Sequence, residues 1–204
     1  MRIGIDIDEV LKDTLKHVNL FFTSRTGEVF PKELFKTYNW WETWGNSKEE
    51  AIKVFDDYVE SSFHHETPVI DGAVEAVKEI LKNHEVFIIT SRPFKHNEKT
   101  IEWLKKNFPD ADLPLIHSTS IYEGDDRLSK SEICKKNKIN LIIEDNRKFA
   151  LECAENGIKT ILFDAPWNQD YNHDNIIRVG NWKRHPYTAW QETLNVIERL
   201  SQKH

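Results

Sequence analysis

The stretch that decides the fold is the N-terminal "MRIGIDIDEVL", residues 1–11. Its apolar run over residues 3–7 predicts a buried β-strand. Three acids, Asp6, Asp8 and Glu9, fall within four residues at the end of that run. Because unpaired buried carboxylates cost several kcal/mol, so many acids at one strand end indicate a functional site. We expect them to share a cation.

Four further β-branched runs predict strands of a parallel sheet, at residues 86–89, 113–117, 141–143 and 160–163, with a weaker strand within 175–180. Stretches with helical spacing of apolar residues lie at 71–81, 98–107, 131–137 and 148–156, and an amphipathic helix closes the chain at 188–200. This alternation is typical of an α/β fold with a doubly wound, mainly parallel sheet and helices on both faces.

The connection between the first two predicted strands is far longer than the others. A crossover between parallel strands needs about a dozen residues or slightly more, whereas here mostly helical, aromatic-rich sequence fills residues 11–68. We therefore predict a small helical insertion at 15–66 and an α/β core formed by 1–14 and 67–204. Because the insertion begins directly after the acidic strand end, we expect it to stand over that end as a lid.

Polar side chains collect at the carboxyl ends of the predicted strands, where open α/β sheets bind their ligands. They are Asp6 and Asp8 after the first strand, Thr90, Ser91 and Arg92 after the second, Glu144 and Asp145 at the end of the fourth, and Lys130 at the start of the helix before the fourth. The set combines acids for a hard cation with a hydroxyl and a lysine for an anion. Such a combination indicates phosphoryl transfer.

Each residue type suits one part of that reaction. Mg²⁺ prefers oxygen ligands and takes one or two carboxylates together with waters and phosphate oxygens, so Asp6 can contact the metal and attack phosphorus. If the strand is regular, Asp8 points to the same face as Asp6, placed to protonate the leaving oxygen and then to activate water. Thr90 and Lys130 are expected to hold the phosphoryl oxygens.

The motifs "DIDEV" (6–10), "ITSR" (89–92), Lys130 and "IIEDN" (142–146) resemble, in order, the four motifs of the haloacid dehalogenase (HAD) superfamily of phosphatases. The segments "VIDGAVEAV" (69–77), "TSRP" (90–93), 130–146, "ILFDAPWNQ" (161–169) and "RVGNW" (178–182) resemble its 5′(3′)-deoxyribonucleotidase-like branch. The resemblance covers about three quarters of the chain. The insertion corresponds in position to the superfamily's C1-type cap.

The resemblance implies a Rossmann-like HAD core and a role for each matching residue. Asp6 is then the nucleophile and a Mg²⁺ ligand, Asp8 the acid/base and a metal ligand through its backbone carbonyl, and Thr90 and Lys130 the phosphate-binding residues. The fourth motif supplies Glu144 and Asp145 to the metal site, and we favour Asp145 as the direct ligand. One departure is Glu9, which stands where the family commonly has Gly.

Several of these residues have structural alternatives. Thr90 and Ser91 could cap a helix as well as bind phosphate. Arg92 could make a structural ion pair as well as contact the substrate. Trp40, Trp41 and Trp44 either pack the core of the insertion or, for Trp40 and Trp41, stack on a nucleobase. His64 and His65 do not converge on a metal, so we interpret residues 64–66 as a solvated hinge.

Composition limits the classes of partner. The 204 residues carry 28 basic and 34 acidic side chains and a net charge of −6, so we expect no duplex nucleic acid as partner. No apolar run approaches the roughly 20 residues that span a bilayer, and two cysteines without CxxC spacing suit a reduced, cytoplasmic protein. The sequence does not indicate an oligomeric state.

The predicted function is therefore a Mg²⁺-dependent phosphomonoesterase with an aspartyl-phosphate intermediate, and nucleoside monophosphates are the leading substrates. Alternatives are a sugar phosphate, a phosphoglycolate-like substrate or a polynucleotide end, and, more remotely, a non-catalytic nucleotide- or phosphate-binding protein. A phospho-accepting receiver domain is disfavoured, because it carries its acceptor Asp on a middle strand and has no long insertion. The sequence alone does not separate ribo- from deoxyribonucleotides, purines from pyrimidines, or 5′ from 3′ phosphates.

Overall fold

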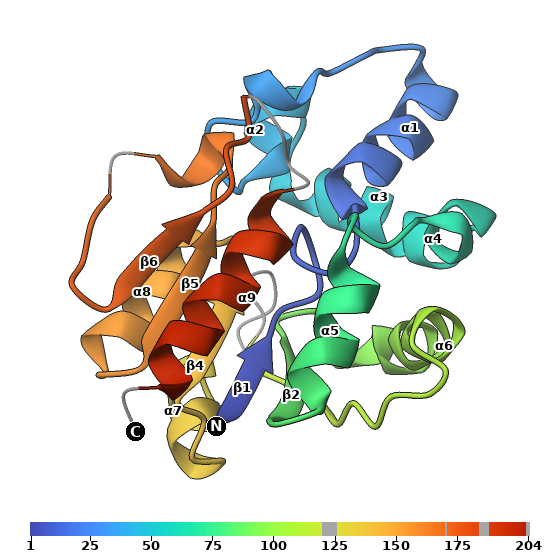
Figure 1. Cartoon of the computed structure of the whole chain (residues 1–204). Helices are drawn as coiled ribbons and strands as arrows, with labels where there is room; N and C mark the ends of the chain where they lie inside the picture. The colour runs from blue at the N-terminus through green and yellow to red at the C-terminus, as the bar shows by residue number, and fades with distance from the viewer. Residues whose placement is uncertain (120–125, 170, 184–187, 203–204) are drawn as a thin grey trace.

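The computed structural model describes residues 1–119, 126–169, 171–183 and 188–202 (Figure 1). Its sheet has six strands, β1 (Arg2–Ile5), β2 (Glu85–Thr90), β3 (Leu115–His117), β4 (Leu141–Glu144), β5 (Lys159–Phe163) and β6 (Ile176–Val179). They lie in the order β3-β2-β1-β4-β5-β6, and every neighbouring pair is parallel. The predicted parallel α/β sheet is confirmed, including the weaker sixth strand.

Strand β1 lies at the centre because its apolar side chains face covered surfaces on both sides. Ile3 pairs with Val86 of β2 and with Leu141 of β4. Gly4 lies between them where space is scarce, since a Cβ atom there would be 2.9 Å from Cδ1 of Ile89. The close approach of strand and side chain therefore favours glycine at this position.

Helices cover both faces of the sheet. On one face α5 (Ala73–Leu81), α6 (Asn97–Asn107) and α9 (Thr188–Ser201) pack over a large apolar cluster that includes Trp103 and Trp190. On the other face α7 (Lys130–Lys136) and α8 (Arg147–Glu155) pack over a smaller cluster that includes Cys134 and Cys153. This two-sided covering confirms the doubly wound architecture, and both cysteines are buried free thiols.

The long connection after β1 is helical. It contains α1 (Thr14–Thr26), the short 3₁₀ helix η1 (Lys32–Leu34), α2 (Trp40–Trp44), α3 (Lys48–Val59) and α4 (Ser62–Glu66). These elements share an apolar cluster of their own, to which Ala165 and Trp167 of the sheet-bearing part also contribute. In Figure 1 they lie beyond the tip of the β1 arrow, at the carboxyl end of the strand.

Two short 3₁₀ helices follow the carboxyl ends of strands, η2 (Phe94–His96) after β2 and η3 (Pro166–Asn168) after β5. Both therefore lie at the edge of the sheet where the acids collect. Among the described residues, no helix combines the length and the apolar character needed to cross a membrane.

Candidate active site

The centre of the site is a buried lysine between two acids. Lys130 is the first residue of α7, whose start is fixed by a capping box between Ser129 and Glu132. Its Nζ lies 2.9 Å from Oδ1 of Asp6 and also donates to Oε1 of Glu144. Lys130 and Glu144 are fully buried, and Asp6 nearly so. Burial opposes the charge on Lys130, but the carboxylates of Asp6 and Glu144 raise its pKa, so the ammonium stays charged.

Glu144 is occupied by protein partners on both carboxylate oxygens. Oε1 accepts from Lys130, and Oε2 accepts from the backbone N–H groups of Asp145 at 2.9 Å and Asn146 at 2.8 Å. Asn146 in turn caps α8 by accepting from the N–H of Lys148. Glu144 thus holds the lysine and the loop after β4 in place.

Asp145 has one carboxylate oxygen without a hydrogen-bond partner in the part of the chain that the structure describes. Its Oδ2 accepts from Nε1 of Trp167 at 2.9 Å, and its backbone carbonyl accepts from Nδ2 of Asn168 at 2.7 Å. Oδ1 is buried and has no hydrogen-bond partner among the described residues. Because a buried polar atom without a partner is costly, this oxygen indicates a ligand that the protein itself does not supply.

The acids around this oxygen fit a divalent cation. One carboxylate oxygen each of Asp6, Glu144 and Asp145 lies within 4.8 Å of the others. Burial and the charge of Glu144 raise the pKa of Asp6 to about 7, and the same causes raise the pKa of Asp145 well above its ordinary value. Carboxylates that repel each other in this way suit a hard cation bound by oxygen ligands. Both oxygens of Glu144 are bound by protein groups, whereas Asp6 is paired with Lys130 through Oδ1 and Asp145 is bound through Oδ2, so Asp6 and Asp145 are the better candidates to coordinate the cation.

Asp8 binds partners different from those of Asp6, although its charge helps to raise the pKa of Asp6, and the expectation that the two share a face is not confirmed. That expectation assumed a regular strand through residue 7, but β1 ends at Ile5. The carbonyl of Ile7 instead accepts from three successive N–H groups, those of Val10, Leu11 and Lys12, and the chain turns. Asp6 therefore contacts Lys130, whereas Asp8 turns to a different cation.

That cation is Arg92, which binds Asp8 through two hydrogen bonds. Nε donates to Oδ2 at 2.9 Å and Nη2 donates to Oδ1 at 2.6 Å, while the Thr14 hydroxyl donates to Oδ1 at 2.5 Å. Burial alone raises the pKa of Asp8, but the charge and hydrogen bonds of Arg92 and the Thr14 hydroxyl lower it to about 2. Asp8 is therefore ionised, and Arg92 makes the ion pair that the sequence left as one of two alternatives.

The remaining donor of Arg92 reaches into the insertion. Nη1 lies 3.3 Å from Nε2 of His64 on α4 and donates to the Thr100 hydroxyl at 3.2 Å. His64 is buried with an exposed fraction of 2%, so the prediction of a solvated hinge is wrong for this residue. Burial, together with the charge of Arg92, lowers the pKa of His64 to about 2, so the ring is neutral.

The hydroxyls of Thr90, the last residue of β2, and of Ser91, which follows it, lie close to Arg92 and Asp8 and do not cap a helix. Thr90 is buried, and its Oγ1 accepts from the N–H of Arg92 at 3.2 Å. Ser91 borders a cavity of about 20 Å³ that is also lined by Asp8 and Trp40. A cavity of that size holds about one water molecule. The space between Asp8 and Trp40 of the insertion is therefore about the size of one water molecule.

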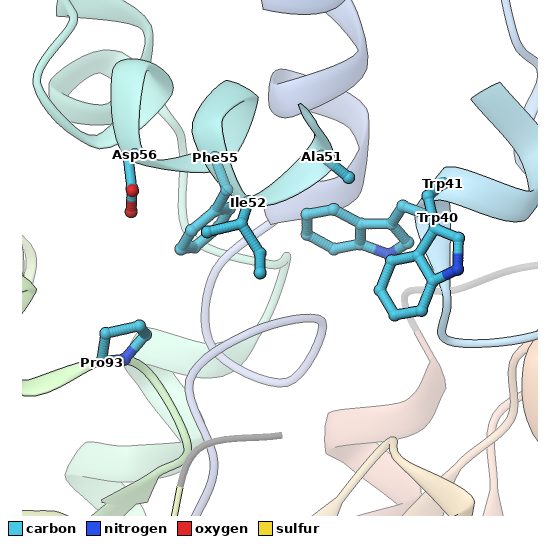
Figure 2. A pocket seen from close by; sticks show the side chains of 7 residues that line it. All are labelled: Trp40, Trp41, Ala51, Ile52, Phe55, Asp56 and Pro93. Carbon is cyan, nitrogen blue, oxygen red and sulfur yellow. The ribbon is translucent and has the colours of Figure 1, made fainter. Parts of the chain in front are cut away.

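Trp40 and Trp41 of α2 form one wall of a second small cavity (Figure 2). Trp40 and Trp41 lie side by side, Phe55 and Asp56 come from α3, and Pro93 comes from the segment after β2. The cavity measures about 10 Å³. Trp40 and Trp44 are buried in the core of the insertion, and Trp44 stacks on Phe22 with a centroid distance of 4.7 Å. Trp40 therefore packs in the core and also faces the cavity beside Asp8.

Sequence reasoning missed Trp167, which orients Asp145, and His64, which contacts Arg92. For Trp167 a signal was available, since it follows the carboxyl end of β5, the same edge of the sheet that carries the acids. For His64 no local signal exists, because its partner Arg92 is 28 residues away in the chain.

The architecture identifies the class of fold. A haloacid dehalogenase-like family hydrolase from Streptococcus pneumoniae superposes with a TM-score of 0.64 at 16% identity, over 96% of this chain and 97% of that chain. A haloacid dehalogenase-like protein from Agrobacterium tumefaciens superposes with a TM-score of 0.63, also at 16% identity, over 98% of each chain. The chain has the HAD-like hydrolase fold.

Sequence comparison identifies the family within that fold. The family described as 5′ nucleotidase, deoxy (pyrimidine), cytosolic type C protein (NT5C) matches residues 1–197, and the chain belongs to it. A 5′(3′)-deoxyribonucleotidase of Bacillus subtilis is 29% identical over 186 residues, 89% of this chain and 94% of that protein. A nucleotidase of Clostridium acetobutylicum is 24% identical over 203 residues, 100% of this chain and 96% of that protein. The expected phosphoric monoester hydrolase is confirmed at this level.

Proposed function

We propose that this protein is a Mg²⁺-dependent nucleotidase that hydrolyses nucleoside or deoxynucleoside monophosphates through an aspartyl-phosphate intermediate. The observation that carries the proposal is the buried Oδ1 of Asp145, which has no partner among the described residues, on an acid that clusters with Asp6, the partner of Lys130. Asp6 and Asp145 would hold the metal by their side chains, and Asp8 by its backbone carbonyl, as in the family that the chain resembles. When bound, Mg²⁺ supplies positive charge that offsets repulsion between the carboxylates and a dianionic phosphate.

Asp6 acts as the nucleophile in this proposal. One carboxylate oxygen of Asp6 forms a bond to phosphorus while the bond between phosphorus and the ester oxygen breaks, and the nucleoside leaves as an alcohol. The buried ammonium of Lys130 and the hydroxyl of Thr90 would hold the phosphoryl oxygens as charge develops on them. The position of Lys130, 2.9 Å from Asp6, supports this role.

Asp8 acts as the general acid and base. It donates a proton to the leaving oxygen and then removes one from the water that attacks the aspartyl phosphate, so the enzyme returns to its starting state. In the present arrangement Arg92 keeps Asp8 ionised, with its pKa near 2. The acid step therefore requires that substrate binding loosens the contact between Asp8 and Arg92 and that Asp8 takes up a proton from solvent before it donates one to the leaving oxygen.

We further propose that the insertion at 15–66 is a cap domain over the core formed by 1–14 and 67–204. The cavities of about 10 and 20 Å³ near Trp40 are too small for a nucleobase, which supports movement of the insertion when a nucleotide binds beside Trp40. Trp41 is half-buried at the cavity of about 10 Å³ and offers a flat surface on which a base can stack. Ser91 borders the cavity of about 20 Å³ together with Asp8, which supports a contact with the substrate.

The family description, which includes the word cytosolic, supports a cytoplasmic location. The net charge of −6 supports a small phosphorylated substrate in preference to a nucleic-acid duplex.

Phosphate release from a panel of substrates tests the proposal. The panel contains 5′- and 3′-nucleoside monophosphates of both sugars, sugar phosphates, phosphoglycolate and a 5′-phosphorylated oligonucleotide, each measured with Mg²⁺ and with EDTA. We expect metal-dependent preference for one class of mononucleotide. Equal turnover of all small substrates would refute the nucleotidase specificity, and a steep salt dependence on the oligonucleotide alone would indicate a polynucleotide end instead.

A further inference from the structure

Glu9 occupies a backbone position that favours glycine. Its φ is 59°, in the left-handed region that a residue with a Cβ atom adopts at a cost, and it directly follows Asp8 in the tight turn after β1. The side chain is nearly fully buried. A strained and buried glutamate persists only where its surroundings hold it.

Two groups from the insertion hold Glu9. Oε1 accepts from the N–H of Leu15 in the first turn of α1 at 2.7 Å, and Oε2 accepts from Nζ of Lys32 on η1 at 3.1 Å. Asp13, the residue that precedes α1, makes no side-chain cap of its own. Glu9 therefore caps α1 from outside the helix and binds η1 at the same time.

Lys32 also contacts the side chain that orients the metal-binding acid. Its Nζ lies 5.1 Å from the ring centroid of Trp167, whose Nε1 donates to Asp145. The lysine is thus the point where η1 of the insertion meets both the turn after β1 and the η3 segment after β5. Its own side chain is 43% exposed, whereas that of Glu9 is 4% exposed.

We infer that Lys32 and Glu9 form a tether between the insertion and the catalytic loop, residues 6–12, and that Lys32 is a positioning residue for catalysis. This inference rests on the proposed function in that the loop carries Asp6 and Asp8. Lys32 neutralises Glu9, so the acid that replaces the common glycine neither repels a phosphate nor leaves its strained position. Without Lys32, a buried carboxylate stands uncompensated three residues from the nucleophile.

Substitution of both partners tests the tether. Lys32→Met is expected to lower kcat/KM roughly fivefold on p-nitrophenyl phosphate, the factor that corresponds to an ion pair worth about 1 kcal/mol. Lys32→Arg keeps the charge and should retain activity. Glu9→Gly in the Lys32→Met background removes both the stranded charge and the strain at positive φ, so kcat/KM should return close to the wild-type value. Lys36→Met, an exposed lysine on the same segment, is the matched control.

Hydrogen exchange at the Leu15 amide provides a readout that does not depend on activity. Lys32→Met should speed its exchange, because Glu9 is no longer held against α1, and the double variant should keep it fast while activity recovers. Wild-type exchange in Lys32→Met would overturn the tether. A double variant as slow in catalysis as Lys32→Met would overturn the inference that Lys32 supports catalysis by neutralising Glu9. If the wild type hydrolyses no phosphate ester, the proposed function fails, while the exchange rate still decides the tether.

Discussion

Removal of the Asp6 carboxylate should make the metal-free protein more stable, although it removes the proposed nucleophile. The pKa of Asp6 rises from 3.8 to about 7 because of burial and the charge of Glu144. A difference of one in pKa corresponds to about 1.4 kcal/mol, so at about pH 8 the ionised carboxylate opposes folding by up to about 4 kcal/mol. Asp6→Asn relieves that repulsion.

The attraction of Lys130 for Asp6 is already contained in this shift, because it lowers the pKa of Asp6 against burial and Glu144. The variant loses the charged partner at 2.9 Å, but Glu144 remains bound to the ammonium. The expected gain at about pH 8 is therefore up to about 4 kcal/mol. For a domain of this size, each kcal/mol corresponds to a rise of about 2–4 °C in the midpoint of thermal unfolding.

The pH dependence has a defined sign. A carboxyl whose pKa is higher in the folded than in the unfolded chain stabilises the fold while it is protonated, and that contribution is lost as the pH rises from about 4 to about 7. The difference in free energy of unfolding between Asp6→Asn and wild type should therefore be small near pH 4 and reach its largest value near pH 8.

Thermal unfolding monitored by circular dichroism in EDTA measures this difference, with Asp110→Asn, an exposed loop carboxylate, as control. Addition of Mg²⁺ should then raise the midpoint of the wild type more than that of Asp6→Asn, because the variant has lost one proposed ligand. A variant less stable than wild type in EDTA near pH 8 would refute the reasoning about the acid cluster.

Four other variants test the groups around the site. Arg92→Met leaves Asp8 buried without its cation and should cost about 3–5 kcal/mol in urea unfolding as well as lower kcat; unchanged stability would show that the ion pair is unimportant. The pKa of His64 is lowered to about 2 by burial and Arg92, so the stability supplied by the neutral ring is complete above about pH 6.5 and is lost as the pH falls. His64→Gln should flatten the change in urea midpoint between about pH 7.5 and 5.5, and an equally steep change would contradict the neutral ring. Trp41→Ala should lower kcat/KM more on nucleotides than on p-nitrophenyl phosphate, whereas Trp40→Ala should cost about 3–5 kcal/mol of stability; equal losses on both substrates for Trp41→Ala would argue against base stacking.

The sheet was predictable from sequence because buried parallel strands are short, continuous apolar runs bounded by polar residues. The end of the first strand was not. The apolar pattern continues through Ile7, but the carbonyl of Ile7 accepts three N–H groups of the turn instead of pairing with a neighbouring strand. An apolar pattern indicates which side chains are buried, and it does not indicate where the strand ends. Ile7 is buried although it lies outside β1.

The acid cluster was predictable to the extent that it follows from topology. Asp6 and Asp145 directly follow adjacent parallel strands, so the fold brings them together whatever their rotamers. The placement of Asp8 was not predictable, because it depends on the turn after β1 and on a choice between Lys130 and Arg92 as partner. That choice is settled by three-dimensional packing, including a contact between Arg92 and His64 of the insertion.

The sequence also did not indicate which ring of the tryptophan motif is accessible. Trp40, Trp41 and Trp44 are close in sequence, yet helix α2 gives them different surroundings. Trp44 packs wholly in the core of the insertion, and Trp40 packs there while also facing the small cavity beside Asp8. Aromatic content alone indicates that a surface is available for packing or stacking, but which ring is accessible depends on helix phase and neighbours.

The most direct test of the central claim is the mass of the Asp6-containing peptide after rapid acid quench of the enzyme turning over a deoxynucleoside 5′-monophosphate with Mg²⁺. We predict a phosphoryl group on Asp6 of the wild type, lost when EDTA replaces Mg²⁺ and absent from the inactive Asp6→Asn protein. Turnover by Asp6→Asn at the wild-type rate would contradict the assignment of Asp6 as the nucleophile.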